Sequence, residues 1–172
     1  MDFTNPTSMF TIPKNASIND LPQFTFRAWV YYGGAEGSRI FQKTAKVLFF
    51  EGNKITFLHD FSITPSYFRV DGLQFAVGNW YDIQISYDNT TTNKPVILIN
   101  GVNYTVTTVL TPSGIPKIDS DGDLILANLQ AGTASLNGYL SEVELYAGIL
   151  SVAEAKRSYN SSCLRYGLPQ IP

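Results

Sequence analysis

The sequence predicts an all-β fold, a two-sheet antiparallel β-sandwich with one short C-terminal helix. Hydrophobic residues make up 44% of the chain and charged residues only 15%, below the quarter that is usual in soluble domains. Short segments alternate between apolar and polar residues almost throughout, and only one segment has helical character. Many short alternating strands need two sheets, because each strand has one face to bury.

The clearest strands lie in the first half of the chain. Residues 24–32 read FTFRAWVYY, and residues 79–88 read NWYDIQISYD. Both alternate at the period of a β-strand. One face of the first strand would fill the core, and its opposite face would carry Arg27, Trp29 and Tyr31. The second strand would turn Trp80, Asp82 and Gln84 away from the core.

The remaining elements follow from turn and capping signals. Glycine-containing pairs between apolar runs indicate hairpin turns at Gly52-Asn53 and Asn100-Gly101, and another turn at Asp71-Gly72. Further strands are expected at 39–44, 124–129 and 139–148. The segment 151–160 reads as a helix, because Ser151 followed by Glu154 forms a capping box. We expect one domain over residues 1–172, with its core at about 3–159 and a tail at 160–172.

Charge and cysteine content exclude several classes of function. The net charge is −2 and no basic stripe occurs, so no nucleic-acid partner is expected. No apolar run approaches the length of a membrane span, so no membrane insertion is expected. The single cysteine, Cys163, excludes an intrachain disulfide. The N-terminus lacks the basic start and apolar stretch of a signal peptide.

The two outward faces together form a candidate ligand platform. Sugar binding needs an aromatic surface for the apolar side of a pyranose and planar polar groups for its hydroxyls. These requirements are met by the outward set Arg27, Trp29, Tyr31, Trp80, Asp82 and Gln84. Loops at the rim of the sandwich, at 31–38, 59–67 and 88–95, are the other expected place for binding residues.

The stretch IDSDGDLIL contains candidate calcium ligands at Asp119, Asp121 and Asp123. Calcium prefers oxygen ligands, and an EF-hand loop needs a bidentate glutamate at its twelfth position. That position is Gln130, which excludes an EF-hand. The stretch therefore predicts either a looser calcium site, the one cofactor that the sequence indicates, or a polar turn at Asp121-Gly122.

The order of these segments resembles the laminin-G-like branch of the concanavalin A-like lectin/glucanase superfamily. The resemblance covers about residues 3–159 and rests on the segments at 9–32, 39–44, 78–102 and 124–159. It implies a jelly roll of two curved sheets. It also implies that Trp29 and Trp80 serve as framework residues under loops, whatever the function. In the glucanase branch a calcium ligand precedes the last strand, where this chain has Ser141 instead of an aspartate.

Catalysis is not expected. Glycosidases of this fold carry paired carboxylates on one strand. The nearest segment here is SEVELY, in which Glu142 and Glu144 lack the intervening aspartate and the third glutamate. His59 stands beside Asp60, but no serine or cysteine lies in a nucleophile context, so His59 is interpreted as a strand-end or loop residue.

The sequence therefore predicts a non-catalytic recognition module that binds carbohydrate or a glycosylated surface partner. An assembly protein of a virion, filament or cell-surface layer is the alternative, and a degenerate glycosidase is a third. Sequons are compatible with an extracellular, cell-surface or virion-surface location. They occur at Asn15, Asn89, Asn103 and Asn160.

Overall fold

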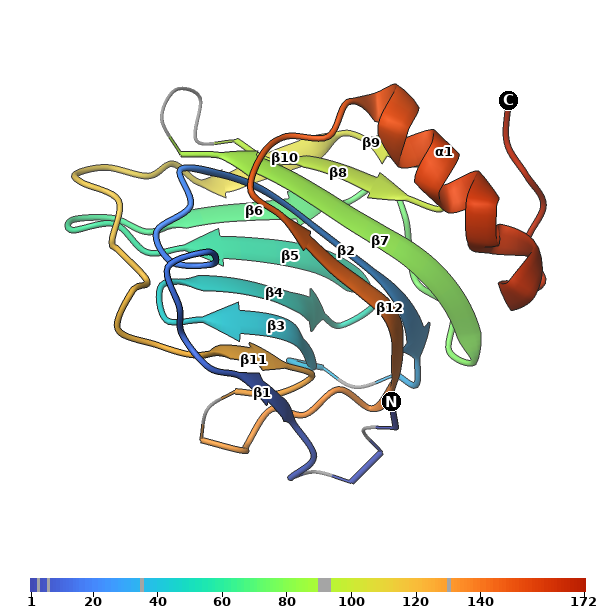
Figure 1. Cartoon of the computed structure of the whole chain (residues 1–172), viewed down its shortest axis with the longest axis horizontal. Coiled ribbons are helices and arrows are strands. Elements are labelled where there is room, and N and C mark those ends of the chain that lie inside the picture. Colours follow the sequence, from blue (N-terminus) through green and yellow to red (C-terminus); the bar gives the residue numbers. More distant parts are fainter. Residues whose placement is uncertain (3, 6, 35, 90–93, 130) are drawn as a thin grey trace.

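The computed structural model contains two antiparallel sheets packed face to face, which confirms the predicted sandwich (Figure 1). It describes residues 1–2, 4–5, 7–34, 36–89, 94–129 and 131–172. The five-stranded sheet has the order β12-β2-β7-β8-β9. Its strands are β2 (Gln23–Tyr32), β7 (Asn79–Asp88), β8 (Val96–Ile99), β9 (Val102–Tyr104) and β12 (Gly138–Tyr146).

The second sheet is seven-stranded, with the order β1-β11-β3-β4-β5-β6-β10. Its strands are β1 (Phe10–Ile12), β3 (Arg39–Lys43), β4 (Lys46–Glu51), β5 (Lys54–His59), β6 (Ser66–Val70), β10 (Val106–Leu110) and β11 (Leu124–Leu126). The β4–β5 and β8–β9 hairpins turn at the predicted Gly52-Asn53 and Asn100-Gly101 pairs.

The core lies between the two sheets. The alternation in β2 points Phe24, Phe26, Ala28, Val30 and Tyr32 inward, and all five are buried. From β7, Ile83, Ile85 and Tyr87 join the same cluster. Apolar faces of both sheets thus meet as the period-two pattern requires.

One predicted element differs from the structure. Residues 96–110 look like a single hairpin in sequence, but the chain leaves the ladder after Tyr104. β9 stays in the five-stranded sheet, while β10 pairs with β6 at the edge of the seven-stranded sheet. The apolar alternation continues through the break at Thr105, so periodicity alone does not reveal the change of sheet.

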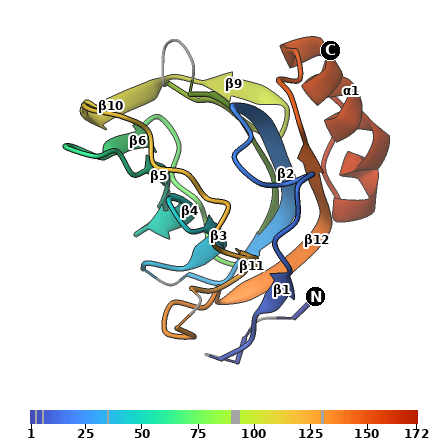
Figure 2. The same ribbon diagram turned by 60° about the vertical axis from the view of Figure 1, so that its left-hand side comes forward.

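The C-terminal segment covers the outer face of the five-stranded sheet. Helix α1 (Val152–Ser162) begins with the predicted capping box between Ser151 and Glu154, and the 3-10 helix η1 (Cys163–Tyr166) follows. Figure 2 shows α1 outside β2 and β12, on the side away from the seven-stranded sheet. No helix in the described ranges is long and apolar enough to cross a bilayer.

The last residues fold back onto this helix. The Asn160 side chain accepts a hydrogen bond from the Ile171 backbone N–H at 2.9 Å and donates to the Ile171 carbonyl at 2.8 Å. The Tyr159 hydroxyl donates to the Pro169 carbonyl at 2.9 Å. The tail at 160–172 therefore contacts its own molecule.

Candidate functional site

The structure brings the six predicted platform residues together on the outer face of the five-stranded sheet. The antiparallel register of β2 and β7 pairs Arg27 with Gln84, Trp29 with Asp82, and Tyr31 with Trp80. Directly opposed side chains in an antiparallel pair lie close enough to interact. The predicted grouping follows from this register.

Four of the six side chains lie beneath the C-terminal helices. Trp29 is 0% exposed, Arg27 and Gln84 are 1% exposed, and Asp82 is 2% exposed. The Trp29 indole N–H donates to the Ser162 hydroxyl at 2.9 Å, and the Tyr166 ring stacks on Trp29 at a centroid distance of 4.0 Å. A ligand could reach these four side chains only if α1 moved away, and their role in binding stays a prediction.

Arg27 is the electrostatic centre of this covered face. Its Nε lies 2.7 Å from the Asp82 carboxylate, and one Nη lies 3.4 Å from Glu144 and 4.0 Å from Glu142. Burial nevertheless raises the pKa of Asp82 to about 6, since Arg27 only partly offsets the lost hydration and the two glutamates add repulsion. Glu142 and Glu144, the two carboxylates of the glycosidase hypothesis, therefore both lie within ion-pair distance of the buried Arg27 guanidinium.

Tyr31 and Trp80 lie at the open end of this face. Tyr31 packs edge-on against Trp80 at 5.6 Å and against Tyr139 at 5.3 Å. Tyr139 is 36% exposed, while Tyr31 and Trp80 are half-buried. Tyr31 and Trp80 are the part of the predicted platform that meets solvent, and Tyr139, which is not among the predicted residues, lies beside them.

The acidic stretch forms a structural turn. Asp119 is buried, and its carboxylate pairs with the Lys46 ammonium and lies 3.5 Å from that of Lys43. Asp123 accepts the Lys14 backbone N–H at 2.9 Å, while Asp121 is exposed. The three carboxylates therefore do not converge, and the described residues contain no group of three His, Cys, Asp or Glu side chains placed to hold a metal ion.

His59 ends β5 inside the sandwich, close to this turn. It is 0% exposed, and its ring nitrogens lie 3.0 Å from the Tyr87 hydroxyl and 3.1 Å from the Lys117 carbonyl oxygen. Burial lowers the pKa of His59 to about 4. At neutral pH the ring is therefore uncharged, and its contacts are those of a core histidine.

The sequons and predicted loops lie in different environments. Asn15 and Asn103 are exposed, whereas the Asn160 amide is engaged by the tail. Asn89 is half-buried, and its sequon, like the predicted loop at 88–95, runs into residues 90–93, which lie outside the described residues. Residue 35 of the loop at 31–38 and Gln130 lie outside them too. The loop at 59–67 contacts the segment before β11, because the Lys117 N–H donates to the Asp60 carbonyl at 2.9 Å.

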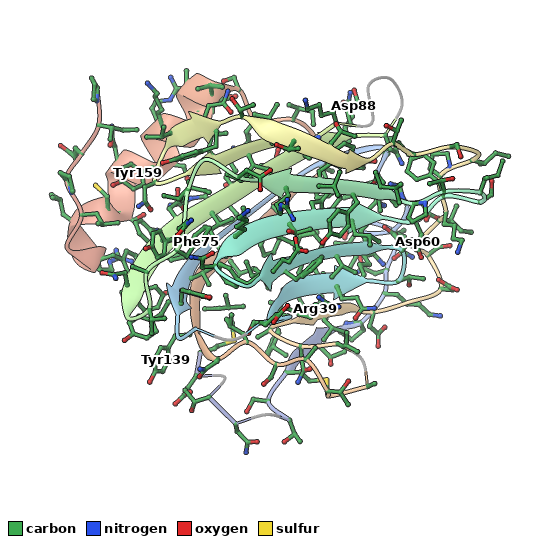
Figure 3. All side chains as sticks on the ribbon, turned by 180° about the vertical axis from the view of Figure 1, so that it is seen from behind. Arg39, Asp60, Phe75, Asp88, Tyr139 and Tyr159 are labelled. Carbon is green, nitrogen blue, oxygen red and sulfur yellow. The ribbon has the colours of Figure 1, made fainter. Side chains whose placement is uncertain are left out.

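Sequence reasoning missed a second polar and aromatic surface, on the outer side of the seven-stranded sheet. We call it the Arg39 face, and Figure 3 views the sheet from this side with Arg39 labelled. A register shift between Arg39 and Phe41 turns both Arg39 and Gln42 outward while Ile40 and Phe41 stay buried. The face consists of half-buried side chains from β3, β4 and β6: Arg39, Gln42, Phe49, Glu51, Tyr67 and Arg69.

Aromatic and charged groups alternate across the Arg39 face. The Arg39 guanidinium lies over the Phe49 ring, 4.4 Å from its centroid, and the Phe49 and Tyr67 rings lie 6.4 Å apart. Burial and, after it, a hydrogen bond to Glu51 raise the pKa of Tyr67 to about 12, so its hydroxyl stays protonated. Glu51 also pairs with Arg69 at 3.1 Å.

Two buried polar atoms of the Arg39 face have no hydrogen-bond partner among the described residues: Arg39 Nε and Gln42 Oε1. The first is a donor and the second an acceptor. Buried polar atoms are almost always paired, because an unpaired one costs about 1–3 kcal/mol. A donor and an acceptor left unpaired beside two aromatic rings resemble a site that lacks its ligand. Within the described ranges, Gln84 of the predicted platform also has an unpaired donor and acceptor, but its side chain is buried.

The fold is that of a two-sheet β-sandwich domain, and sequence comparison assigns the family. The family model of the concanavalin A-like lectin/glucanases superfamily matches residues 4–156, so the chain belongs to this superfamily. A search of curated protein sequences gives no significant match.

Solved structures show the same fold at low identity. A Bacteroides ovatus ATCC 8483 protein, whose name proposes carbohydrate binding, is 16% identical with a TM-score of 0.67 over 85% of this chain and 43% of its own. The binding domain of Paraclostridial Mosquitocidal Protein 1 is 14% identical, with a TM-score of 0.66 over 93% of this chain and 42% of its own. Mouse laminin alpha1 domains LG4-5 are 14% identical, with a TM-score of 0.63 over 87% and 42%. The chain spans less than half the length of each.

Proposed function

We propose that this chain is a non-catalytic recognition module that binds a carbohydrate, free or on a glycosylated partner, at an extracellular, cell or virion surface. The ligand lies on the Arg39 face. The observation that carries the proposal is the unpaired donor and acceptor, Arg39 Nε and Gln42 Oε1, beside the Phe49 and Tyr67 rings. Ligand hydroxyls would satisfy both atoms while a pyranose packs on the rings.

The rigidity of the Arg39 face supports the proposal. Its side chains belong to β3, β4 and β6. These strands lie in one sheet, because β3 pairs with β4 while β4 and β6 both pair with β5. Glu51 is fixed by Arg69, and Arg69 is fixed again by Asp71 at 2.7 Å. A preorganised surface loses little conformational entropy on binding, which favours the weak contacts that sugars offer.

Replacing Phe49 by alanine tests this site. We expect F49A to weaken glycan binding by about two- to tenfold, because an aromatic contact contributes about 0.5–1.5 kcal/mol. Binding is measured on a glycan array and then by calorimetry with the best hit. The matched control is Y139A, an aromatic deletion on the opposite sheet, which should leave affinity unchanged. Equal affinity of F49A and the parent would refute the site, and an empty array would refute carbohydrate binding.

Assembly is the second candidate function, and the β10 edge favours it. Among the described strands β10 pairs only with β6, which leaves its other edge free. The strand reads VTTVL, with no charge or proline over Val106–Leu110, and Val109 is 46% exposed. Natural edge strands usually carry a charged residue or a proline, which prevents pairing with another chain. Although a register shift interrupts the pairing between Thr108 and Leu110, an edge without charge or proline fits addition of a strand from another copy of the chain.

A lysine at the β10 edge tests assembly. If copies pair through β10, V109K should abolish the oligomer, because a charged lysine on an edge strand disfavours addition of another strand. Native mass spectrometry at several concentrations gives the readout. I149K serves as control, since Ile149 has nearly the same exposure, 44%, and lies outside the strands. A monomeric parent protein would remove this candidate.

A further inference from the structure

One cation on the Arg39 face has no carboxylate paired with it within the described part of the chain. Arg69 pairs with Glu51 at 3.1 Å and with Asp71 at 2.7 Å, and Lys54 pairs with Asp71 at 2.9 Å. Arg39 has no carboxylate within ion-pair distance among the described residues, and no residue outside them is charged. The local sum is three cations against two anions, and the unmatched charge belongs to Arg39.

Arg39 is also held in place without being neutralised. Its guanidinium lies 4.4 Å from the centroid of the Phe49 ring, and its Nε is buried. Burial lowers the pKa of the Arg39 side chain. A ring contact of this kind offsets about 0.5–2 kcal/mol, but the ring accepts no hydrogen bond from Nε. A planar, fixed guanidinium with unused donors has the geometry for bidentate binding of an oxyanion.

We propose that the ligand of the Arg39 face is an acidic glycan, whose carboxylate or sulfate binds Arg39 while its sugar ring packs on Phe49 and Tyr67. This inference rests on the proposed function. The anion would supply the counter-charge that Arg39 lacks and the acceptor that its Nε lacks. Gln42 Oε1, on the same strand, would accept a hydroxyl of the same sugar. The net charge of −2 gives no general attraction to polyanions, so affinity for an acid would come from this local site.

Matched neutral and acidic probes test the ligand class. One pair is oligogalacturonate against its methyl ester, which removes the charge and keeps the backbone. The other is sulfated against unsulfated cellohexaose. We expect at least one acid to bind about tenfold or more tightly than its neutral partner, the effect of one charge-assisted hydrogen bond. The two pairs also distinguish carboxylate from sulfate.

The variant R39Q should abolish this preference, because it should weaken binding of the acid more than binding of its neutral partner, and R39K should retain part of the preference. K117Q is the control, because it removes one charge at an exposed lysine that lies outside the Arg39 face. Equal binding of neutral and acidic probes, or equal effects of R39Q and K117Q, would overturn the inference. If neutral glycans bind and F49A weakens their binding, the proposed function holds even where the inference of an acidic ligand fails. If no glycan binds, both proposals fail.

Discussion

The variant R27A is expected to lose about 3–5 kcal/mol of unfolding free energy at pH 7.5, the cost of breaking a buried ion pair by removing one partner. Arg27 is 1% exposed, and it holds Asp82 at 2.7 Å beneath α1. It also donates to the Ser162 hydroxyl at 3.1 Å and to the Ser158 carbonyl at 3.3 Å. Removing it leaves a buried carboxylate without its cation and removes two hydrogen bonds between the sheet and the helix.

The pH dependence separates charge from packing in this variant. The Asp82 pKa is already raised to about 6, and without Arg27 it should rise further. R27A should therefore be less destabilised at pH 5, where Asp82 is neutral, than at pH 7.5. Urea unfolding at both pH values gives the measurement. The double variant R27M/D82L, which removes both charges, should recover much of the loss. An equal loss of unfolding free energy at both pH values would show that R27A destabilises the protein through lost packing and not through the Asp82 charge.

The same region shows how far sequence reasoning reaches. Alternation in β2 and β7 correctly assigns the inward residues, because a strand's faces depend only on its period of two. It cannot say what covers the outer face, since that depends on contacts between residues 27–29 and 158–166, more than a hundred positions apart. A signal existed in Ala155, Tyr159 and Ser162, whose helical spacing of four and three marks a buried stripe.

The Arg39 face shows a second limit. In β4 the period-two pattern does turn Phe49 outward. In β3, however, the register shift places Arg39 and Gln42, three positions apart, on one face. Strict alternation assigns them to opposite faces. Bulges are set by pairing with a neighbouring strand and have no fixed sequence signature. The alternation pattern therefore cannot predict that Arg39 and Gln42 lie on the same face.

The acidic turn shows a third limit, which concerns partners distant in sequence. Asp119, Asp121 and Asp123 look equivalent in the sequence, and their spacing fits calcium. Only Asp119 turns inward, because Lys46, 73 positions earlier, supplies the opposite charge. Its backbone N–H and carboxylate also exchange hydrogen bonds with Asp20. Long-range pairing decides that one aspartate stabilises a loop while its neighbours meet solvent.

His59, in the same part of the interior, is expected to make the fold acid-labile. Its pKa in the folded protein is about 4, against an ordinary value of 6.5. Between pH 4 and pH 6.5 the histidine is protonated in the unfolded chain but neutral in the folded protein. Stability from this group is therefore complete above pH 6.5 and falls as the pH drops to about 4. A difference of this size corresponds to about 3 kcal/mol.

Asp82 opposes this effect, so the parent protein alone does not reveal it. A carboxyl pKa raised to about 6 contributes stability below about pH 4 that is lost as the pH rises through 6. The informative quantity is therefore the difference between the parent and H59Q. Replacing the ring lowers stability at every pH, but the gap should narrow by about 3 kcal/mol between pH 6.5 and pH 4. Because the chain has one histidine, its imidazole proton signals can be followed without assignment and should titrate near pH 4. A midpoint near 6.5, with parallel stability curves for parent and variant, would mean that the ring is solvated and that the interior near the acidic turn opens in solution.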